Sequence, residues 1–314
     1  MTVNRFVYKH ILSGSYKGWI ILDEFSLCEL KLWAFLYRLV DTCKFICVGS
    51  WDQLPPVGGH QWLDTQIGDD CVEKSRMFHA LCGGNRVSLK TCKRSDSTLY
   101  DWYTSLCPGG SRYETDFQEV LTEARGFFSG TDTPRWTLCI DHALRRKINR
   151  EANFREKTKE AIWVKVPKSH CANAPQDFWL YPRQMLMAHV QVSKVVKNGM
   201  FYKVKAIHDH QANLQATLQA KNRGGFSSED GQDQRPSQGQ IRPSQDVEFE
   251  GGIRLPLKFV ARNMRLVHAL TIQSSQGRTL PGPVEIISSH KRFTRKHLMI
   301  CLSRATEASL VQVR

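Results

Sequence analysis

The sequence has no long apolar run and no secretory signal. A membrane-spanning helix needs about 20 consecutive apolar residues, and no apolar stretch of 18 residues occurs in the chain of 314. The N-terminus also lacks the basic and then apolar pattern of a secretory signal. We therefore expect an intracellular protein with no membrane partner, and the sequence leaves open a nuclear, organellar or viral location.

The cysteines lack the spacing of a metal site. None of the ten forms a C-x-x-C pair, and Cys43 and Cys47 are the closest two. The histidines at 79, 208 and 210 have no partners at ligand spacing either. Zinc sites need four such ligands close together. We therefore expect reduced, buried thiols and structural or surface histidines.

Acidic residues are in the minority. The chain has 44 Lys and Arg against 30 Asp and Glu, a formal net charge of +14. From Gly251 to Arg314 there are eleven basic residues against Glu285 and Glu307, which gives 11 − 2 = +9. A solvated basic face is one explanation, but an excess of this size favours a polyanionic partner such as nucleic acid.

Two carboxylates follow a short apolar stretch near the N-terminus. Trp19–Leu22 are four consecutive apolar residues, which predict a buried parallel strand, and Asp23 and Glu24 come directly after them. Ligands of open α/β sheets bind at the carboxyl ends of the strands. In a nucleotide-hydrolysing site, Asp23 would hold Mg²⁺, and Glu24 would orient or deprotonate the attacking water. A solvated pair of acids at a strand end is the alternative.

A second apolar run supports the catalytic interpretation. Lys44–Gly49 predicts another strand, which leads into a polar loop that carries Gln53. The amide of Gln53 would act there as a neutral phosphate sensor.

Four segments, in this order along the chain, resemble motifs of the RecD/Pif-type branch of superfamily-one DNA helicases. The first is similar to "IIDExSM", and the second to "GDxxQLPPV" with Ser50 in place of the usual acidic residue. The third is similar to "AxTIHKSQGxT", with Gln273 and Ser274 in place of its His and Lys, and the fourth is "LSRAT". The segments are Ile20–Leu27, Gly49–Val57, Ala269–Thr279 and Leu302–Thr306.

The resemblance implies roles for individual residues. Arg304 matches the arginine that contacts the γ-phosphate, and Arg94, in the similar stretch Val87–Asp96, is a second candidate contact. For both, a surface arginine at a helix start is the alternative. Gln276 and Gly277 belong to the nucleotide site, Gly277 by allowing a tight strand-to-helix turn. Small hydroxyl side chains suit contacts with DNA phosphates, and the residues assigned to that role are Thr2, Thr271, Ser274 and Ser275.

The glycine-rich phosphate loop of this family is missing. No segment has the pattern G-x-x-x-x-G-K-S/T, whose backbone amides and lysine bind phosphates. The loop precedes the Asp-Glu strand in the family, whereas here only 22 residues precede Asp23. We therefore expect Met1 to be an internal methionine of a longer reading frame, or a second chain to supply the missing layer. Otherwise the apolar faces of Ile20–Leu22 and Phe45–Val48 would lack cover.

Local patterns predict individual elements. Ser26 and Glu29 indicate a capping box at the start of a helix that continues to about Val40. Asp141 indicates the cap of another helix, in which Leu144, Ile148 and Ala152 repeat at i, i+4 and i+8. Three apolar runs predict strands, the last of which would put Arg304 at a strand's carboxyl end: Trp136–Ile140, Val284–Ile287 and His297–Leu302.

The predicted fold class is α/β, with P-loop NTPase RecA-like motor domains, the first of them incomplete, and a small SH3-like β insert. Short β-like runs surround the turn Asn198-Gly199, and this segment resembles the hairpin of the SH3-like insert in these helicases. A disordered loop is expected at residues 224–246, which are rich in Gly, Ser, Gln and Pro. The predicted segments are 1–85 (first motor domain), 86–160 and 253–314 (second motor domain) and 161–252 (insert).

By resemblance, the function is ATP-driven translocation on single-stranded DNA with duplex unwinding. ATP and Mg²⁺ would be bound, and single-stranded DNA or duplex junctions would be the partners. Without the phosphate loop, a non-catalytic nucleic-acid-binding remnant of a helicase is the first alternative. A structural or interaction protein that uses the 224–246 loop as a partner site is the second.

Overall fold

The computed structural model describes residues 2–12, 16–56, 58–167, 175–190, 195–209 and 245–314. They belong to two compact units, one formed by Met1–Thr133 with Ser275–Arg314 and the other by Pro134–Ser274. The predicted disordered loop lies outside the described residues, apart from Gln245 and Asp246. The division into four segments stays a prediction.

The first unit contains a parallel strand pair that positions the Asp-Glu motif. Strand β1 (Gly18–Leu22) pairs in parallel with β2 (Cys43–Cys47), and Leu22 lies opposite Cys47. Both predicted strands are therefore confirmed, and their carboxyl ends meet at one edge. The expectation of a fully buried strand is wrong, because β1 buries only alternate residues. Ile20 and Leu22 are buried, whereas Ile21 is 69% exposed.

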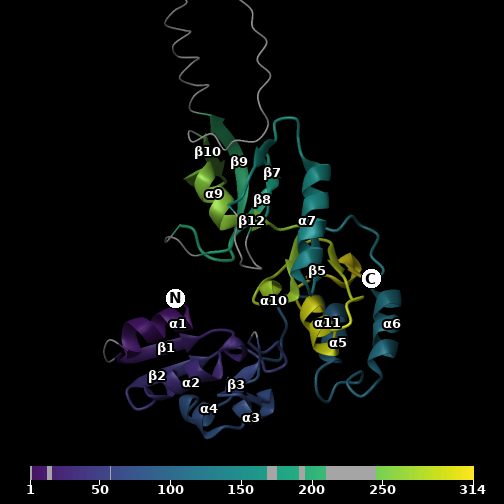
Figure 1. Cartoon of the computed structure of the whole chain (residues 1–314). Coiled ribbons are helices and arrows are strands. Elements are labelled where there is room, and N and C mark those ends of the chain that lie inside the picture. The colour runs from purple at the N-terminus through teal and green to yellow at the C-terminus, as the bar shows by residue number, and fades with distance from the viewer. Residues whose placement is uncertain (1, 13–15, 57, 168–174, 191–194, 210–244) are drawn as a thin grey trace, which may run out of the picture. The chain divides into compact units, whose positions relative to one another are not determined.

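Short helices cover the face of β1 and β2 that carries the buried Leu22 (Figure 1). Trp33 and Leu36 of one helix are almost completely buried and pack with Leu22, Phe25 and other apolar residues into one core cluster. The helices, turns and strands of this part are α1 (Val3–Phe6), a π-helical turn (Val7–Ile11), a 3₁₀ turn (Phe25–Leu27), α2 (Leu30–Tyr37), β3 (His60–Trp62), β4 (Thr65–Ile67), α3 (Asp69–Glu73) and α4 (Arg76–Leu81).

The predicted capping box at Ser26 is wrong. Ser26 lies inside the 3₁₀ turn, and α2 begins only after Glu29, whose side chain makes no capping hydrogen bond. The turn follows from the backbone of Glu24, which has a positive φ of 51° and breaks the extended chain directly after β1. The helix therefore starts later and ends at Tyr37 rather than near Val40.

The remaining elements of the first unit come from two separate stretches of the chain, residues 97–127 and 284–313. Helix α11 packs on α5, and α6 packs on β15 (Figure 1). Strand β14 pairs in parallel with β15, which confirms the predicted strand near Val284. These elements are α5 (Ser97–Thr104), α6 (Phe117–Phe127), β14 (Val284–Ile286), α11 (Arg295–Leu302), a 3₁₀ turn (Ala308–Leu310) and β15 (Val311–Val313).

The strand predicted at His297–Leu302 is wrong, because these residues form helix α11. The side chain of Thr294 accepts a hydrogen bond from the backbone of His297, and the His297 ring accepts one from the backbone of Thr294. This reciprocal pair is a capping box. Leu298 to Leu302 are all buried, so the run shows no helical periodicity, and an apolar run of this length does not distinguish a strand from a buried helix.

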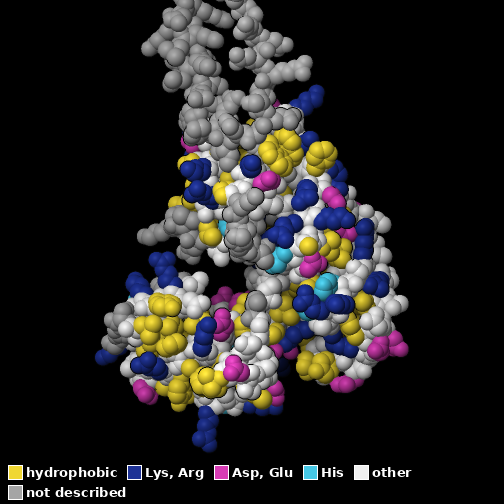
Figure 2. All heavy atoms as spheres, viewed as in Figure 1, with side chains coloured by type: hydrophobic (Ala, Val, Ile, Leu, Met, Phe, Trp, Pro, Cys, Tyr) yellow, Lys and Arg dark blue, Asp and Glu magenta, His cyan; other side chains and the backbone are white. Residues whose placement is uncertain are grey.

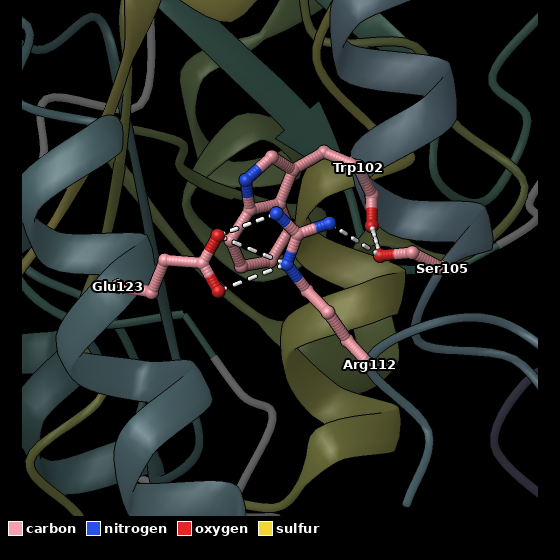
Figure 3. A network of polar contacts seen from close by, with 4 residues as sticks. All are labelled: Trp102, Ser105, Arg112 and Glu123. Carbon is pink, nitrogen blue, oxygen red and sulfur yellow. Dashed lines mark hydrogen bonds and ion pairs between the residues drawn. The ribbon is translucent and has the colours of Figure 1, made fainter. Parts of the chain in front are cut away.

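A polar network fixes the loop between α5 and α6 (Figure 3). Arg112 Nε donates to both carboxylate oxygens of Glu123, at 3.1 and 2.9 Å, and its Nη1 donates to Ser105 Oγ at 3.1 Å. The guanidinium also lies over the Trp102 ring, 4.6 Å from the centroid. One arginine therefore joins both helices of this part of the unit, which is a structural role.

The second unit combines a parallel strand pair with an antiparallel sheet. Strands β5 and β13 are parallel, and α7 packs against both. A five-stranded antiparallel sheet has the order β11-β10-β9-β8-β12. The elements are β5 (Trp136–Cys139), α7 (His142–Glu156), β6 (Ile162–Val164), β7 (Phe178–Leu180), β8 (Met185–Ala188), β9 (Phe201–Asp209), β10 (Gln245–Phe249), β11 (Arg254–Pro256), α9 (Leu257–Asn263), β12 (Met264–Leu266) and β13 (Ala269–Thr271). The SH3-like assignment of this sheet stays a prediction.

Asp141 caps α7 as predicted, since its side chain accepts a hydrogen bond from Leu144 N at 2.7 Å. The predicted helix is confirmed, with Ala152 buried and Leu144 and Ile148 half-buried. The other buried positions of α7 are polar: Arg145, Asn149 and Asn153. Asn149 replaces apolar packing with two hydrogen bonds to the backbone of Ala269, one to its N–H and one to its carbonyl, both 2.9 Å. No helix in the described parts of the chain is long and apolar enough to cross a membrane.

Candidate functional site

The Asp-Glu motif lies where β1 and β2 end together. Asp23 is exposed, and its Oδ1 accepts a hydrogen bond from Glu24 N at 3.0 Å. Phe25 N donates to Val48 O at 3.1 Å, which ties the turn after β1 to the end of β2. A Cβ on Gly49 would lie 2.9 Å from Phe25 N, so only glycine permits this approach.

The loop after β2 carries Gln53, whose backbone N–H donates to Ser50 O at 3.4 Å. Ser50, which replaces the acidic residue of the related motif, donates from its hydroxyl to Asp52 Oδ2 at 2.9 Å. The same hydroxyl accepts from Asp52 N at 3.2 Å, so Ser50 holds the turn that precedes Gln53. Gln53 Oε1 is buried and has no hydrogen-bond partner among the described residues.

The far end of the sequence supplies Gln276 and Gly277. A short helix, α10 (Ile272–Ser275), precedes them, and Gly277 has a φ of +71°. Gly277 therefore permits a turn that follows a helix, which corrects the predicted strand-to-helix turn. A Cβ on Gly277 would lie 3.4 Å from Glu24 Oε1, so the two residues are neighbours. Gln276 is only 8% exposed, and both polar atoms of its amide are buried without a partner in the described structure.

Arg304 follows the C-terminus of α11, not the end of a strand as predicted. It is 3% exposed, and its Nε donates to Ile300 O at 3.3 Å, one of the carbonyls left open at the helix end. Nε and Nη2 also donate to Ser303 Oγ, at 3.1 and 2.8 Å. Nη1 is buried and has no partner among the described residues. The guanidinium is thus held in place with one donor unused.

Ser303 connects the two predicted phosphate contacts. Its carbonyl accepts a hydrogen bond from Arg94 Nη1 at 3.2 Å, while its hydroxyl accepts from Arg304. Sequence reasoning assigned no role to Ser303, although it stands inside the "LSRAT" segment directly before Arg304. The signal available in the sequence was the position of Ser303 directly before Arg304, a predicted phosphate contact.

The electrostatics of Arg304 reflect this arrangement. Burial, and then the nearby Arg94 guanidinium, lower the pKa of Arg304 to about 10, while the Glu24 carboxylate acts in the opposite direction. The three side chains therefore interact within one unit, with two positive charges against one negative charge. Such a pair of guanidiniums favours an oxygen anion, which would gain charge-assisted hydrogen bonds.

The residues predicted to contact DNA lie in two segments, at the start of α1 and at the end of β13 with α10. Thr2 caps α1, where its hydroxyl accepts from Arg5 N at 3.3 Å. Thr271 is buried, and its hydroxyl donates to Ser274 Oγ at 3.0 Å, while Ser274 Oγ donates to Thr271 O at 2.9 Å. Ser275 is fully buried. Their assignment to DNA stays a prediction.

The described residues contain no group of three or more His, Cys, Asp or Glu side chains placed to hold a metal ion. Cys43 and Cys47 are free thiols, the first buried and the second half-buried. A pocket of about 780 Å³ opens elsewhere in the first unit, beside Trp51 and Asp69, and contains none of the predicted site residues. Among the described residues, Glu24, Arg94 and Arg304 therefore form the cluster of predicted site residues that interact with one another.

Comparison with known proteins gives a consistent structural match. No protein-family model and no curated protein matches the chain. Among solved structures, the Pif1 helicase from Candida albicans superimposes with a TM-score of 0.57 at 18% identity, over 94% of this chain and 72% of that one. The chain has the Pif1 helicase fold. The Pif1 helicase from Bacteroides, solved in complex with ADP-AlF3 and single-stranded DNA, gives a TM-score of 0.57 at 17% identity over 96% and 71% of the two chains.

The Pif1 fold confirms the predicted fold class, a mixed α/β structure of RecA-like motor type with parallel strands. At these identities the match concerns the fold alone, so the roles of individual residues depend on the local geometry described above.

Proposed function

We propose that the chain belongs to the Pif1-type helicases and acts as an ATP-dependent motor on single-stranded DNA. One observation carries this proposal: the buried Arg304 keeps a hydrogen-bond donor unused, beside Arg94 and Glu24. Burying a cation without a full set of partners costs stability, so its retention suits a guanidinium that awaits an anionic ligand. A terminal phosphate of ATP fits that requirement.

Each residue of the cluster has a proposed role in ATP hydrolysis. Glu24 would orient or deprotonate the attacking water, and its positive φ holds the carboxylate at the strand edge beside Gly277. Gln53 and Gln276 offer buried amide groups that can hydrogen-bond to phosphate oxygens or water. Arg304 and Arg94 would stabilise negative charge on the transferred phosphoryl group, with Ser303 positioning both.

The carboxylate of Asp23 suits Mg²⁺. This ion usually takes one or two protein carboxylates and completes its shell with waters and phosphate oxygens. Asp23 is exposed, and only its Oδ1 accepts a hydrogen bond, from Glu24 N. When bound, Mg²⁺ would neutralise phosphate charge, and Asp23 would hold it next to Glu24.

Single-stranded DNA is the proposed track. The Bacteroides Pif1 helicase with this fold was solved with single-stranded DNA. The charge of +9 over residues 251–314 of this chain (11 − 2) supports the same partner. Duplex junctions would be the substrates if the chain unwinds DNA while it moves. We propose an intracellular location, with the compartment left open.

A second candidate is a DNA-binding protein without catalysis. It is favoured by one feature, the absence of a G-x-x-x-x-G-K-S/T segment from the sequence. The β- and γ-phosphates would then lack their usual backbone amides and lysine. Loss of oriented contacts of this kind costs on the order of 10³-fold in rate.

Phosphate release from ATP, with and without oligodeoxythymidine, distinguishes the two functions. We expect turnover slower than about 1 per second, the lower end of ordinary kinase rates. DNA should stimulate this turnover, and Glu24→Gln should abolish it. Glu29→Gln, at an ion-paired surface residue of the same segment, should leave the rate unchanged. DNA binding without hydrolysis, or hydrolysis that survives Glu24→Gln, would exclude the motor proposal for this chain.

A further inference from the structure

The second unit carries an exposed aromatic cluster on the two-stranded pair β6–β7 and the end of α7. Trp163 and Trp179 lie directly opposite each other across the pair, with ring centroids 5.1 Å apart. Phe154 of α7 is 61% exposed and Trp163 is 40% exposed. We call these three residues the aromatic platform. Neighbouring positions on the strands, Val164 and Phe178, face the core and are buried.

A lysine joins the members of the aromatic platform. Lys157 Nζ lies 4.0 Å from the centroid of the Phe154 ring and 4.6 Å from that of Trp179. Its ammonium group is therefore fixed beside the rings by cation–π contacts, while the residue remains exposed. A positive charge is thus held next to exposed ring faces.

The aromatic platform is rigid. Asn153 Nδ2 donates to Trp179 O, and Trp179 N donates to Asn153 Oδ1, both at 2.8 Å. These two bonds fix β7 to α7, so a ligand that stacks on the rings would not have to order the strand first. Preorganisation of this kind reduces the entropy lost on binding.

The surroundings are basic. From Leu144 to Lys165 there are eight Lys and Arg against three Glu, which gives 8 − 3 = +5. One of the three carboxylates, Glu156, already has polar neighbours, because Tyr181 donates to it at 3.4 Å and His268 lies 3.6 Å from it. Figure 2 shows hydrophobic side chains next to Lys and Arg side chains around the upper part of α7.

We propose that the aromatic platform with Lys157 is a binding site for single-stranded nucleic acid, with unpaired bases stacked on Trp163 and Phe154 and a phosphate near Lys157. Base faces are accessible in a single strand and covered in a duplex, and aromatic side chains beside positive charge are the general means of binding them. This site rests on the proposed function, a motor on single-stranded DNA, and adds a second place where the strand is bound. None of its residues belongs to the predicted nucleotide or DNA contacts.

The test measures binding of a fluorescein-labelled oligodeoxythymidine of about 16 nucleotides, which is the upper limit of the length that one single-strand-binding OB fold covers. Trp163→Ala and Phe154→Ala should each weaken binding about fivefold or more, and Trp163→Phe should keep most of the affinity. Phe154 is so exposed that its removal leaves the fold intact. The matched control is Trp62→Ala, at a 53% exposed tryptophan of another two-stranded pair, β3–β4, in an acidic segment.

Salt dependence separates stacking from a general loss of structure. Trp163→Ala should lower the affinity at every salt concentration without changing the slope of log K against log[salt], because the ring is uncharged. Lys157→Gln should reduce that slope by about 0.7, the value for one phosphate contact on a single strand. Binding to a blunt duplex should be unaffected by Trp163→Ala.

Three outcomes would overturn the site. If the unaltered chain binds the oligonucleotide but Trp163→Ala and Phe154→Ala bind equally well, the aromatic platform is not used while the proposed function stands. If Trp62→Ala weakens binding as much as Trp163→Ala, the effect is not specific to this site. Failure of the unaltered chain to bind any single strand at low salt would overturn the site together with the proposed DNA partner.

Discussion

The carboxylate of Glu24 lies against the backbone of Gly277, although the two residues come from opposite ends of the sequence. A Cβ on Gly277 would be 3.4 Å from Glu24 Oε1, and Gly277 has a φ of +71°. Position 277 suits glycine in two ways. Its backbone is left-handed, and a side chain there would be in contact with the carboxylate of the proposed general base, Glu24.

Gly277→Ala should separate these two effects. A left-handed conformation costs an L-residue about 1–2 kcal/mol, so the free energy of unfolding should fall by that amount in a urea titration. The added methyl group would also lie in van der Waals contact with Glu24 Oε1 and shield that oxygen, which should weaken nucleotide binding. Gly109→Ala is the control, since Gly109 has a φ of +81° and nothing within 4 Å of its Cβ position. It should lose similar stability and no nucleotide affinity, and equal losses of affinity in both variants would contradict the contact.

Acid should destabilise the protein well above the range in which carboxylates titrate. Burial lowers the pKa of His60, His142, His189 and His297. Below pH about 6.5 the unfolded chain takes up protons on these rings, whereas the folded chain does so only at lower pH. The free energy of unfolding should therefore decrease from pH 7.5 to 5.5.

His60 offers a direct check of this pH dependence. Its ring is 1% exposed and lies next to Trp51, with Asp69 at 3.9 Å. In His60→Phe, the loss of stability between pH 7.5 and 5.5 should be smaller than in the unaltered chain. The same substitution at His79, which is exposed on α4, should leave the pH dependence as it was. An unchanged dependence in His60→Phe would contradict the lowered pKa of His60.

Binding to single-stranded DNA should depend strongly on salt. The charge of +9 over residues 251–314 predicts several phosphate contacts. Each should contribute about 0.7 to the slope of log K against log[salt], measured by fluorescence anisotropy between low and moderate salt. A flat response would mean that the basic residues of this segment do not contact the DNA backbone.

The sequence predicted the two strands that precede the Asp-Glu motif and the Gln53 loop. Four apolar residues before Asp23 and a second run before Gly49 define two parallel strands, and parallel strands bring their carboxyl ends to one edge. Asp23 and Glu24 directly follow the first of these strands. The strands could be predicted because each is formed by a short local run of apolar residues, whereas the roles of Glu24 and Gln53 stay predictions.

Other parts depend on contacts between distant residues, which no local pattern contains. Asn149 of α7 is buried because it hydrogen-bonds to the backbone of Ala269, and hydrophobic periodicity does not indicate such a polar position. Helix α11 was predicted as a strand because it is buried on all sides. The link from Arg94 through Ser303 to Arg304 likewise becomes visible only when both ends of the chain are folded together.

The most direct measurement for the central claim is the preference of the chain for an ATP analogue over ADP, by calorimetry with AMP-PNP and Mg²⁺. If Arg304 Nη1 is the donor reserved for the γ-phosphate, the unaltered chain should bind the analogue about tenfold or more tightly than ADP, the usual effect of one charged hydrogen bond. Arg304→Met, which keeps the length of the side chain without its charge, should bind both nucleotides equally. An equal preference in Arg304→Met and the unaltered chain, or no binding of either nucleotide, would contradict the account.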